Sequence, residues 1–334
     1  MRTVLLTALL LAATPTHAQT TATPAPAPVT AATPGAATLT LTAPVGTLAE
    51  FVTTTRTRLT LEDVQVTRAD GTAPSEAELA ELRRGVQEVL GRAGTQTSVL
   101  KTFYRVEERA PDGTVTLVNT VVTDVPGQGP LSIRIVQTVA PDGAVNVTRL
   151  ESDNPLVQSA LSGLSPEALR SQTGSGSSDL TGVYGRAFPV GQPVTRTVTV
   201  DAQALLGGLL GAIAAGLGGG QNPLGGVQAS PLTTTTVTTY RGPNPAGLRV
   251  FETRSTSGDW TLELGGGAAG FPRVRLELLG GSRSDGLSLY RPDGLPVGNT
   301  QTQTLRMRVG VTPPDGERLT MLVRLEQSVT LRPR

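Results

Sequence analysis

The chain has 334 residues, with no cysteine and a single histidine, so disulfides, thiol catalysis and thiolate metal sites are excluded. Its 28 basic and 27 acidic residues nearly balance, which leaves no overall positive charge for binding nucleic acid or an anionic membrane surface. A chain of this length can bury a full hydrophobic core without disulfide support.

The N-terminal segment, residues 1–18, has the pattern of a secretory signal peptide. Arg2 provides the positive charge, Val4–Ala13 the short apolar core, and Thr16-His17-Ala18 the small-residue cleavage site. We expect cleavage after Ala18, which leaves no transmembrane span and removes the histidine. The sequence therefore predicts a secreted protein of the periplasm or cell envelope of a bacterium.

A mature chain without cysteine or histidine has few groups for catalysis, because it lacks imidazole for proton transfer, a zinc site or a Ser-His-Asp triad. The adjacent carboxylates of Glu62-Asp63 and Glu107-Glu108 would face opposite sides of a strand, so we interpret them as solvated positions. The sequence contains no phosphate loop or dinucleotide-binding motif. We predict a protein that is not an enzyme, has no cofactor or metal, and binds no nucleic acid.

Residues 19–38 are rich in proline, alanine and threonine, and we expect them to form an extended tether. We expect a single domain over residues 39–334, because Thr, Val and Leu alternate there with polar residues at the two-residue period of half-buried strands. A long strand is expected around Thr55–Leu61. The further strands are expected at Thr97–Glu107, Thr114–Thr123, Leu131–Val139, Ala144–Glu151, Val194–Val200, Thr233–Tyr240, Leu248–Thr256, Trp260–Leu264, Arg273–Leu279, Gly286–Tyr290, Gln301–Val311 and Arg318–Leu331.

A Pro-Asp-Gly turn recurs between these strands. Proline presets φ, aspartate bonds to the backbone, and glycine accepts a positive φ. The flanking strands make each turn a hairpin loop, so the pairing is predicted to be antiparallel. The turns are Ala110–Gly113, Ala140–Gly143, Arg291–Gly294 and Pro313–Gly316.

Three segments depart from the strand pattern. Ser75–Gly91 predicts a helix with a capping box made by Ser75 and Glu78. Asn154–Gln172 predicts one or two short helices. The third segment is the uncharged, glycine-rich stretch Ala204–Gly220, for which Asp201 is a plausible N-cap.

As a helix, this third segment would carry all of its large side chains on one side, backed by glycine and alanine. It is too short to span a membrane, and its glycines make it dependent on a partner surface. Three roles stay open: core under the sheet, lining or lid for an apolar ligand, and contact with a bilayer surface. Under the second, the ligand-binding residues are Leu205, Leu206, Leu209, Leu210, Ile213 and Leu217.

The turn from Phe188 to Val194, which leads into a strand, resembles a feature of bacterial secreted envelope proteins of unknown function. Their order of hairpins, helix, turn and long strands is similar to that of lipoprotein-carrier proteins of the LolA/LppX type. The resemblance implies a curved antiparallel half-barrel with helices over an apolar cavity. The chain departs from these proteins in having no lipidation cysteine and no tryptophan after Gly191.

The fold expected is mainly β (α+β): a curved antiparallel sheet or half-barrel of long strands with two or three helices packed on the concave face. The favoured function is a secreted, non-enzymatic envelope protein that binds or carries an apolar, lipid-like ligand between sheet and helices. The alternative is a structural or protein-interaction module of the cell envelope, with an envelope protein as partner and no ligand.

Overall fold

The computed structural model describes residues 35–68, 70, 72–93, 95–125, 129–155, 158, 183–200, 227–265, 272–313 and 318–334. The signal-peptide segment, most of the tether and the stretch Ala204–Gly220 lie outside the described residues. Within the described part the chain is mainly β and all strand pairs between elements are antiparallel, as predicted. None of the described helical segments is long and apolar enough to cross a membrane.

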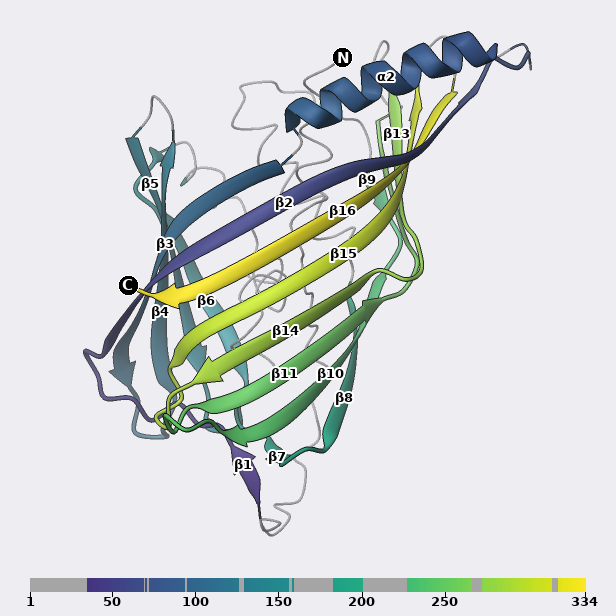
Figure 1. Ribbon diagram of the computed structural model, residues 1–334. Helices are drawn as coiled ribbons and strands as arrows, with labels where there is room; N and C mark the ends of the chain where they lie inside the picture. The colour runs from purple at the N-terminus through teal and green to yellow at the C-terminus, as the bar shows by residue number, and fades with distance from the viewer. Residues whose placement is uncertain are drawn as a thin grey trace.

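One sheet of 14 strands makes up most of the molecule (Figure 1). Its main path runs through β6 (Val145–Ser152), β5 (Gly129–Val139), β4 (Val115–Val125), β3 (Thr95–Arg109), β2 (Leu48–Thr67), β16 (Arg318–Pro333), β15 (Pro296–Thr312), β14 (Arg283–Tyr290), β11 (Arg249–Ser257), β10 (Leu232–Pro243) and β8 (Pro193–Val200). The second half of β15 also starts a branch through β13 (Arg273–Leu278), β12 (Trp260–Leu264) and β9 (Val227–Ala229).

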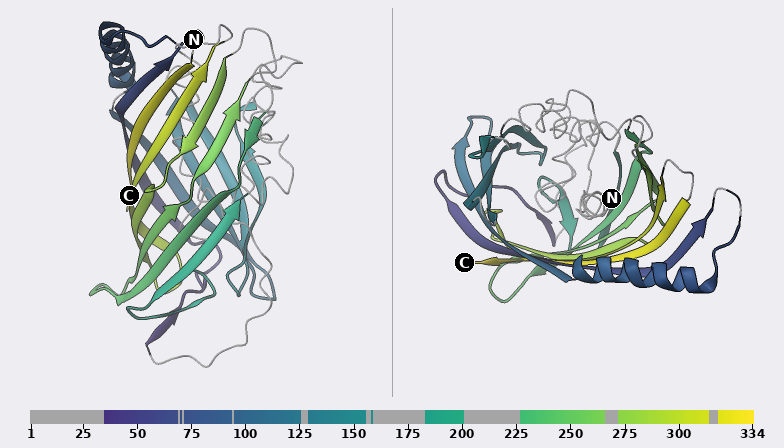
Figure 2. Two further views of the ribbon diagram at one scale, coloured as in Figure 1. Left: turned by 90° about the vertical axis from the view of Figure 1, so that its right-hand side faces the viewer. Right: turned by 90° about the horizontal axis from the view of Figure 1, so that it is seen from above.

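The sheet curves strongly and stays open, as Figure 2 shows. Its two end strands, β6 and β8, do not pair with each other in the described structure. The predicted curved sheet or half-barrel is therefore confirmed. The strands are long, up to 20 residues in β2, because threonine, valine and leucine, which suit a half-buried strand, recur along them.

A short two-stranded sheet lies at the lower end of the molecule in Figure 1. It pairs β1 (Ala36–Thr38) with β7 (Ala187–Pro189). The last residues assigned to the tether therefore form a strand. Leu39, which follows β1, and Phe188, in the middle of β7, are almost fully buried, at 0% and 1% exposed.

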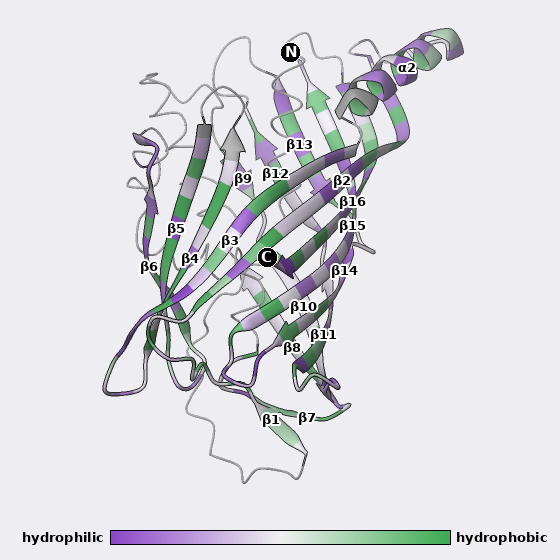
Figure 3. Ribbon diagram, turned by 60° about the vertical axis from the view of Figure 1, so that its left-hand side comes forward, coloured by the Kyte–Doolittle hydropathy of each residue, from purple (hydrophilic) through white to green (hydrophobic). Residues whose placement is uncertain are grey.

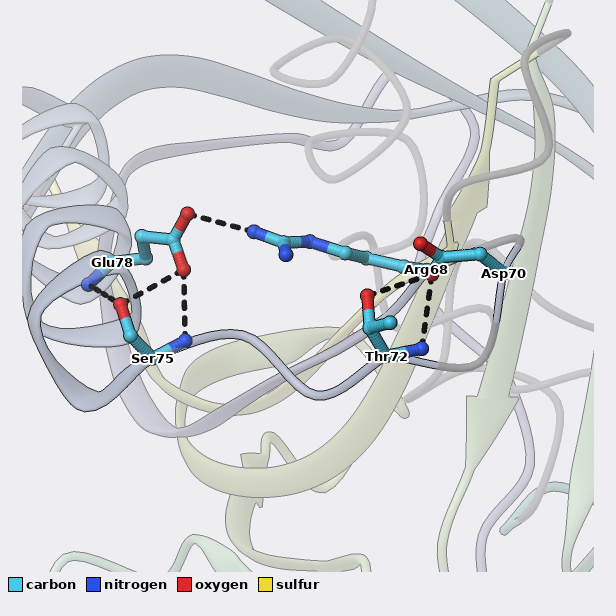
Figure 4. Close-up of polar contacts among 5 residues, drawn as sticks. All are labelled: Arg68, Asp70, Thr72, Ser75 and Glu78. Atoms are coloured by element: carbon cyan, nitrogen blue, oxygen red, sulfur yellow. Dashed lines mark hydrogen bonds and ion pairs between the residues drawn. The ribbon is translucent and has the colours of Figure 1, made fainter.

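The single helix in the described structure is α2 (Glu76–Ala93). The predicted capping box is present: the Glu78 backbone N–H donates to Ser75 Oγ at 3.3 Å, and the Ser75 N–H donates to Glu78 Oε2 at 2.8 Å (Figure 4). The expectation of two or three helices is not met within the described residues. Almost all of the predicted helix Asn154–Gln172, and all of the third, lie outside them.

The position of α2 also differs from the prediction. β3 pairs β2 only as far as Arg58, and α2 lies against the second half of β2, which β3 leaves unpaired. Figure 2 shows the helix outside the curve of the sheet rather than on its concave face. Leu82 and Val86, one turn apart on the helix, provide its apolar contact.

The described Pro-Asp-Gly turns are hairpin loops, as predicted. Gly113, Gly143 and Gly294 have φ of +87°, +85° and +88°, and each N–H donates to the carbonyl three residues earlier. The fourth turn, Pro313–Gly316, lies almost entirely outside the described residues.

Apolar side chains gather at both ends of the sheet. The lower cluster, beside β1 and β7, joins residues from both arms of the curved sheet: Leu39, Leu41, Ala43, Val106, Val115, Leu117, Val139, Val183, Tyr184, Phe188, Tyr240, Phe251, Tyr290 and Leu295. The upper cluster lies over β2, β16, β15 and the branch: Val64, Leu262, Val274, Leu276, Leu278, Leu305, Met307, Val309, Val311, Met321, Val323 and Leu325.

Candidate ligand-binding face

The strand register assigns side chains to the two faces of the sheet. Val106 on one arm and Phe251 on the other both belong to the lower cluster, which lies between the arms. Residues that pair directly with Val106 or Phe251, and every second residue along each strand from these, therefore face the concave side. The residues between them face the convex side. On β2, for example, Thr53, Thr55 and Thr57 are concave and Thr54 is convex.

The convex face carries most of the charge. Glu62, at a bulge in β2, accepts hydrogen bonds from Arg306 at 2.9 and 3.0 Å and pairs with Arg324 at 3.0 Å. Glu107 and Glu151 both pair with Arg134. Further convex ion pairs are Arg308–Glu277, Arg275–Glu277, Arg275–Glu263, Arg254–Asp285 and Arg241–Glu252. The carboxylates of Glu62 and Glu107 are thus partners of arginines.

The concave face is almost free of charge in the described strands, where Arg109, Arg196 and Arg249 are the exceptions. Arg109 lies at the lower end and donates to the carbonyls of Leu41 and Ala43 at 3.2 and 3.0 Å. Arg249 lies at the lower end, and its guanidinium donates to the carbonyl of Thr38 at 2.7 Å. Figure 3 shows the alternation of hydrophobic and hydrophilic residues along the strands that produces this separation of the two faces.

Between the two apolar clusters the concave face of the described strands is polar and, apart from Arg196, uncharged. Directly paired positions on eight neighbouring strands, from β8 to β3, form a line that we call the central polar row: Arg196, Thr236, Ser255, Ser284, Gln303, Gln327, Thr57 and Gln96. At about 4.8 Å between strands, the row is about 34 Å long. Except for Arg196 at its edge, every member is neutral.

Some members of this face bond to each other. Thr236 and Ser255 share a hydrogen bond of 2.9 Å, Gln301 Nε2 donates to Ser284 Oγ at 2.8 Å, and Gln327 Nε2 donates to Thr57 Oγ1 at 3.3 Å. On the other arm, Thr53 and Thr102 share a bond of 3.0 Å. These contacts hold part of the polar face in place.

Other polar atoms of the same face are buried without a hydrogen-bond partner among the described residues: Asn119 Oδ1, Gln137 Nε2 and Oε1, Asn299 Oδ1, Gln303 Oε1 and Gln327 Oε1. The residues Asn119, Gln137 and Gln303 are only 5%, 0% and 8% exposed. A buried polar atom left unpaired costs free energy, typically about 1–3 kcal/mol. A group of such atoms on one face therefore needs an explanation, and a bound group is one.

Arg196 is the charged end of the central polar row. The pKa of its guanidinium is lowered from the ordinary value, first because burial disfavours the cation and second because Arg186 adds a like charge. The lowered pKa values of Asp112 and Glu252 have local causes: hydrogen bonds from Thr114 act on Asp112, and one from Arg241 acts on Glu252.

A depression of about 360 Å³ lies over β11, β14 and β15 around Gly286. Glu252, Arg254 and Asp285 are among its lining residues. It is therefore not the apolar space between sheet and helices that the sequence led us to expect.

The six predicted ligand-binding residues, Leu205, Leu206, Leu209, Leu210, Ile213 and Leu217, lie outside the described residues. No group of three or more acidic or histidine side chains suited to a metal occurs in the described part of the chain. Trp260 begins β12, as expected of a strand-start anchor, and packs against the upper cluster.

The central polar row could not be recognised from the sequence. Its members are ordinary strand residues, spaced irregularly along the chain from Thr57 to Gln327, and only the register brings them into one line. The available signal was that alternate positions of the strands are neutral, such as Thr53, Thr55 and Thr57, which alternate with Thr54, Arg56 and Arg58.

No protein-family model matches the chain, and no curated protein or solved structure was found to be similar to it.

Proposed function

We propose that this protein is a secreted, non-enzymatic envelope protein that binds or carries an apolar, lipid-like ligand on the concave face of its sheet. The observation that supports this most is the separation of charge between the faces. Ion pairs occupy the convex face, whereas the described concave face is neutral except for Arg109, Arg196 and Arg249.

A neutral concave face suits an apolar ligand for a physical reason. Burying a charged side chain against hydrocarbon costs several kcal/mol unless it is paired, whereas burying apolar area yields about 25 cal/mol per Å². The upper and lower apolar clusters would contact the hydrocarbon parts of the ligand. Of the three roles left open for the stripe from Leu205 to Leu217, this proposal takes contact with the ligand.

Lipid carriage of the LolA/LppX type fits this arrangement as a hypothesis. Those carriers have a curved half-barrel layout, and this chain has a curved open sheet. The chain has no cysteine, so a carrier of this kind would work without a lipid attached to a cysteine of its own.

Adjacent residues of β2 supply a matched test. Thr55 faces the concave side and Thr54 the convex side, and both are half-buried. The protein is secreted by a bacterial host, purified without detergent and examined by native mass spectrometry. We expect the wild-type chain and Thr54→Glu to carry a lipid-like mass, and Thr55→Glu to lose most of it.

Wild-type protein that never carries such a mass, also after incubation with an envelope lipid extract, contradicts the proposal. That result points to the alternative, a structural or protein-interaction module. Equal loading of the two variants, with both folded by circular dichroism, places the ligand somewhere other than the concave face.

A further inference from the structure

The central polar row lies between two apolar clusters, and this position bears on the chemistry of the ligand. Leu305 and Leu325, next to Gln303 and Gln327 on their strands, belong to the upper cluster. Phe251, on the other side of the row from them, belongs to the lower cluster. A purely apolar ligand crossing this face would cover the row without satisfying its polar atoms.

Gln303 and Gln327 form the centre of the row. They are directly opposite each other on β15 and β16, and the Oε1 atom of each is buried without a partner among the described residues. Gln327 is oriented by its Nε2, which donates to Thr57. The pair therefore presents two carbonyl acceptors side by side.

We infer that the central polar row is a subsite for an uncharged, hydroxyl-bearing part of the ligand, which makes the ligand a neutral glycolipid-like amphiphile. This inference rests on the proposed function and specifies the ligand class. Hydroxyl groups donate to the amide oxygens of Gln303 and Gln327 and accept from the hydroxyls of Ser284 and Thr57.

A charged headgroup fits the row poorly. The described charge on the row is Arg196, which lies four strands from Gln303, about 19 Å away at ordinary strand spacing. A phosphate or ammonium group placed at the two glutamines would be removed from water without an opposite charge beside it, which is costly.

The test compares two amphiphiles with the same alkyl chain, n-dodecyl β-maltoside and n-dodecylphosphocholine, below their micellar concentrations. Binding to the full secreted chain, freed of bound lipid, is measured by isothermal titration calorimetry. We expect the maltoside to bind about tenfold more tightly, as one or two additional hydrogen bonds would give.

The variant is the double substitution Gln303→Met and Gln327→Met, which keeps the length of both side chains and removes their polar atoms. We expect it to abolish the preference for the maltoside. Gln65→Met is the matched control, because Gln65 is exposed on β2 and its Nε2 bonds to Asp63. If the double variant does not fold, Ser284→Ala and Thr57→Val take its place.

Equal affinity for the two amphiphiles in the wild-type chain, or a preference that survives the double substitution, overturns this inference and leaves lipid binding intact. If neither amphiphile binds, the proposed function fails together with the inference. The two failures are therefore distinguishable.

Discussion

The start of α2 shows how a few side chains define a local structure. Glu78 Oε2 accepts from the backbone and the hydroxyl of Ser75, both at 2.8 Å, and Glu78 Oε1 accepts from Arg68 at 2.7 Å (Figure 4). These bonds hold the pKa of Glu78 below its ordinary value, the backbone bond first. Because the folded pKa is lowered, the contribution of Glu78 to stability is present at neutral pH and lost as pH falls through the folded pKa.

We predict that an NMR titration of the Glu78 carboxyl gives a pKa below that of an ordinary glutamate. Ser75→Ala removes the hydroxyl donor, so it should move this pKa upward while the backbone donor still acts. A pKa in the ordinary range in the wild-type chain, or one unchanged by Ser75→Ala, would show that the capping box does not form in solution.

Glycine is required where the Ala140–Gly143 turn meets the chain at Tyr184. Gly143 has φ of +85°, and a Cβ added there would lie 1.9 Å from the carbonyl oxygen of Tyr184. Gly46 has nearly the same φ, +86°, but an added Cβ would meet nothing within 4 Å. Comparing substitutions at Gly46 and Gly143 therefore separates the cost of backbone strain from the cost of a steric clash with Tyr184.

We predict that Gly46→Ala costs about 1 kcal/mol of unfolding free energy, from left-handed strain alone. Gly143→Ala should cost about 3 kcal/mol or more, because a backbone contact must also move. Urea denaturation followed by circular dichroism measures both. Similar costs for the two variants would mean that the Gly143–Tyr184 approach is absent in solution.

These residues also show what the sequence could predict. Ser75 and Glu78 are three residues apart, so local pattern was enough to find the capping box. The approach of Gly143 to Tyr184 joins segments far apart in the chain, and no local pattern encodes it.

At the scale of elements, α2 covers an edge. From Leu59 to Thr67, β2 pairs with β16 on one side and has α2 beside the other. An uncovered strand edge exposes backbone groups and invites pairing with another chain. Leu82 and Val86 make an apolar contact there, Leu90 of the same helix is buried, and Arg83 pairs with Asp63 of β2.

We predict that Leu82→Ser with Val86→Ser detaches α2, since each lost apolar contact weakens docking by about 1–2 kcal/mol. Hydrogen exchange measured by mass spectrometry should then increase in α2 and in Leu59–Thr67, while β10 and β11 stay protected. Gln87→Ser, at an exposed position of the same helix, is the control and should leave exchange unchanged. Unchanged exchange in the double variant would show that α2 is not held by this contact.

Most long strands were predictable because alternation and turn residues both mark them. β12 begins and ends as predicted at Trp260 and Leu264, and β6 and β8 differ by a residue or so. The short strands β1, β7 and β9 were missed, because three residues carry too little alternation. Helix placement was wrong for α2, since its apolar stripe shows that one side packs but not against which surface.

At the scale of the whole molecule, the strand register aligns the alternating charged and uncharged residues of neighbouring strands. The two faces of the sheet therefore differ in chemistry. The convex face is covered by ion pairs, and the concave face carries apolar clusters at both ends with neutral polar side chains between them. The sequence predicted the alternation and the curved sheet. It could not predict which positions lie opposite each other, and the ligand-binding face depends on that.

The most direct test of a ligand on the concave face uses Trp260, the one tryptophan of the chain, which packs against the upper cluster on that face. An amphiphile with a brominated alkyl chain quenches tryptophan on contact. The comparison protein is Trp260→Phe with Val99→Trp, since Val99 is 57% exposed on the convex side. The account predicts saturable quenching of Trp260 and no saturable quenching of the tryptophan at position 99. Equal quenching at both positions, or quenching at position 99 alone, would contradict it.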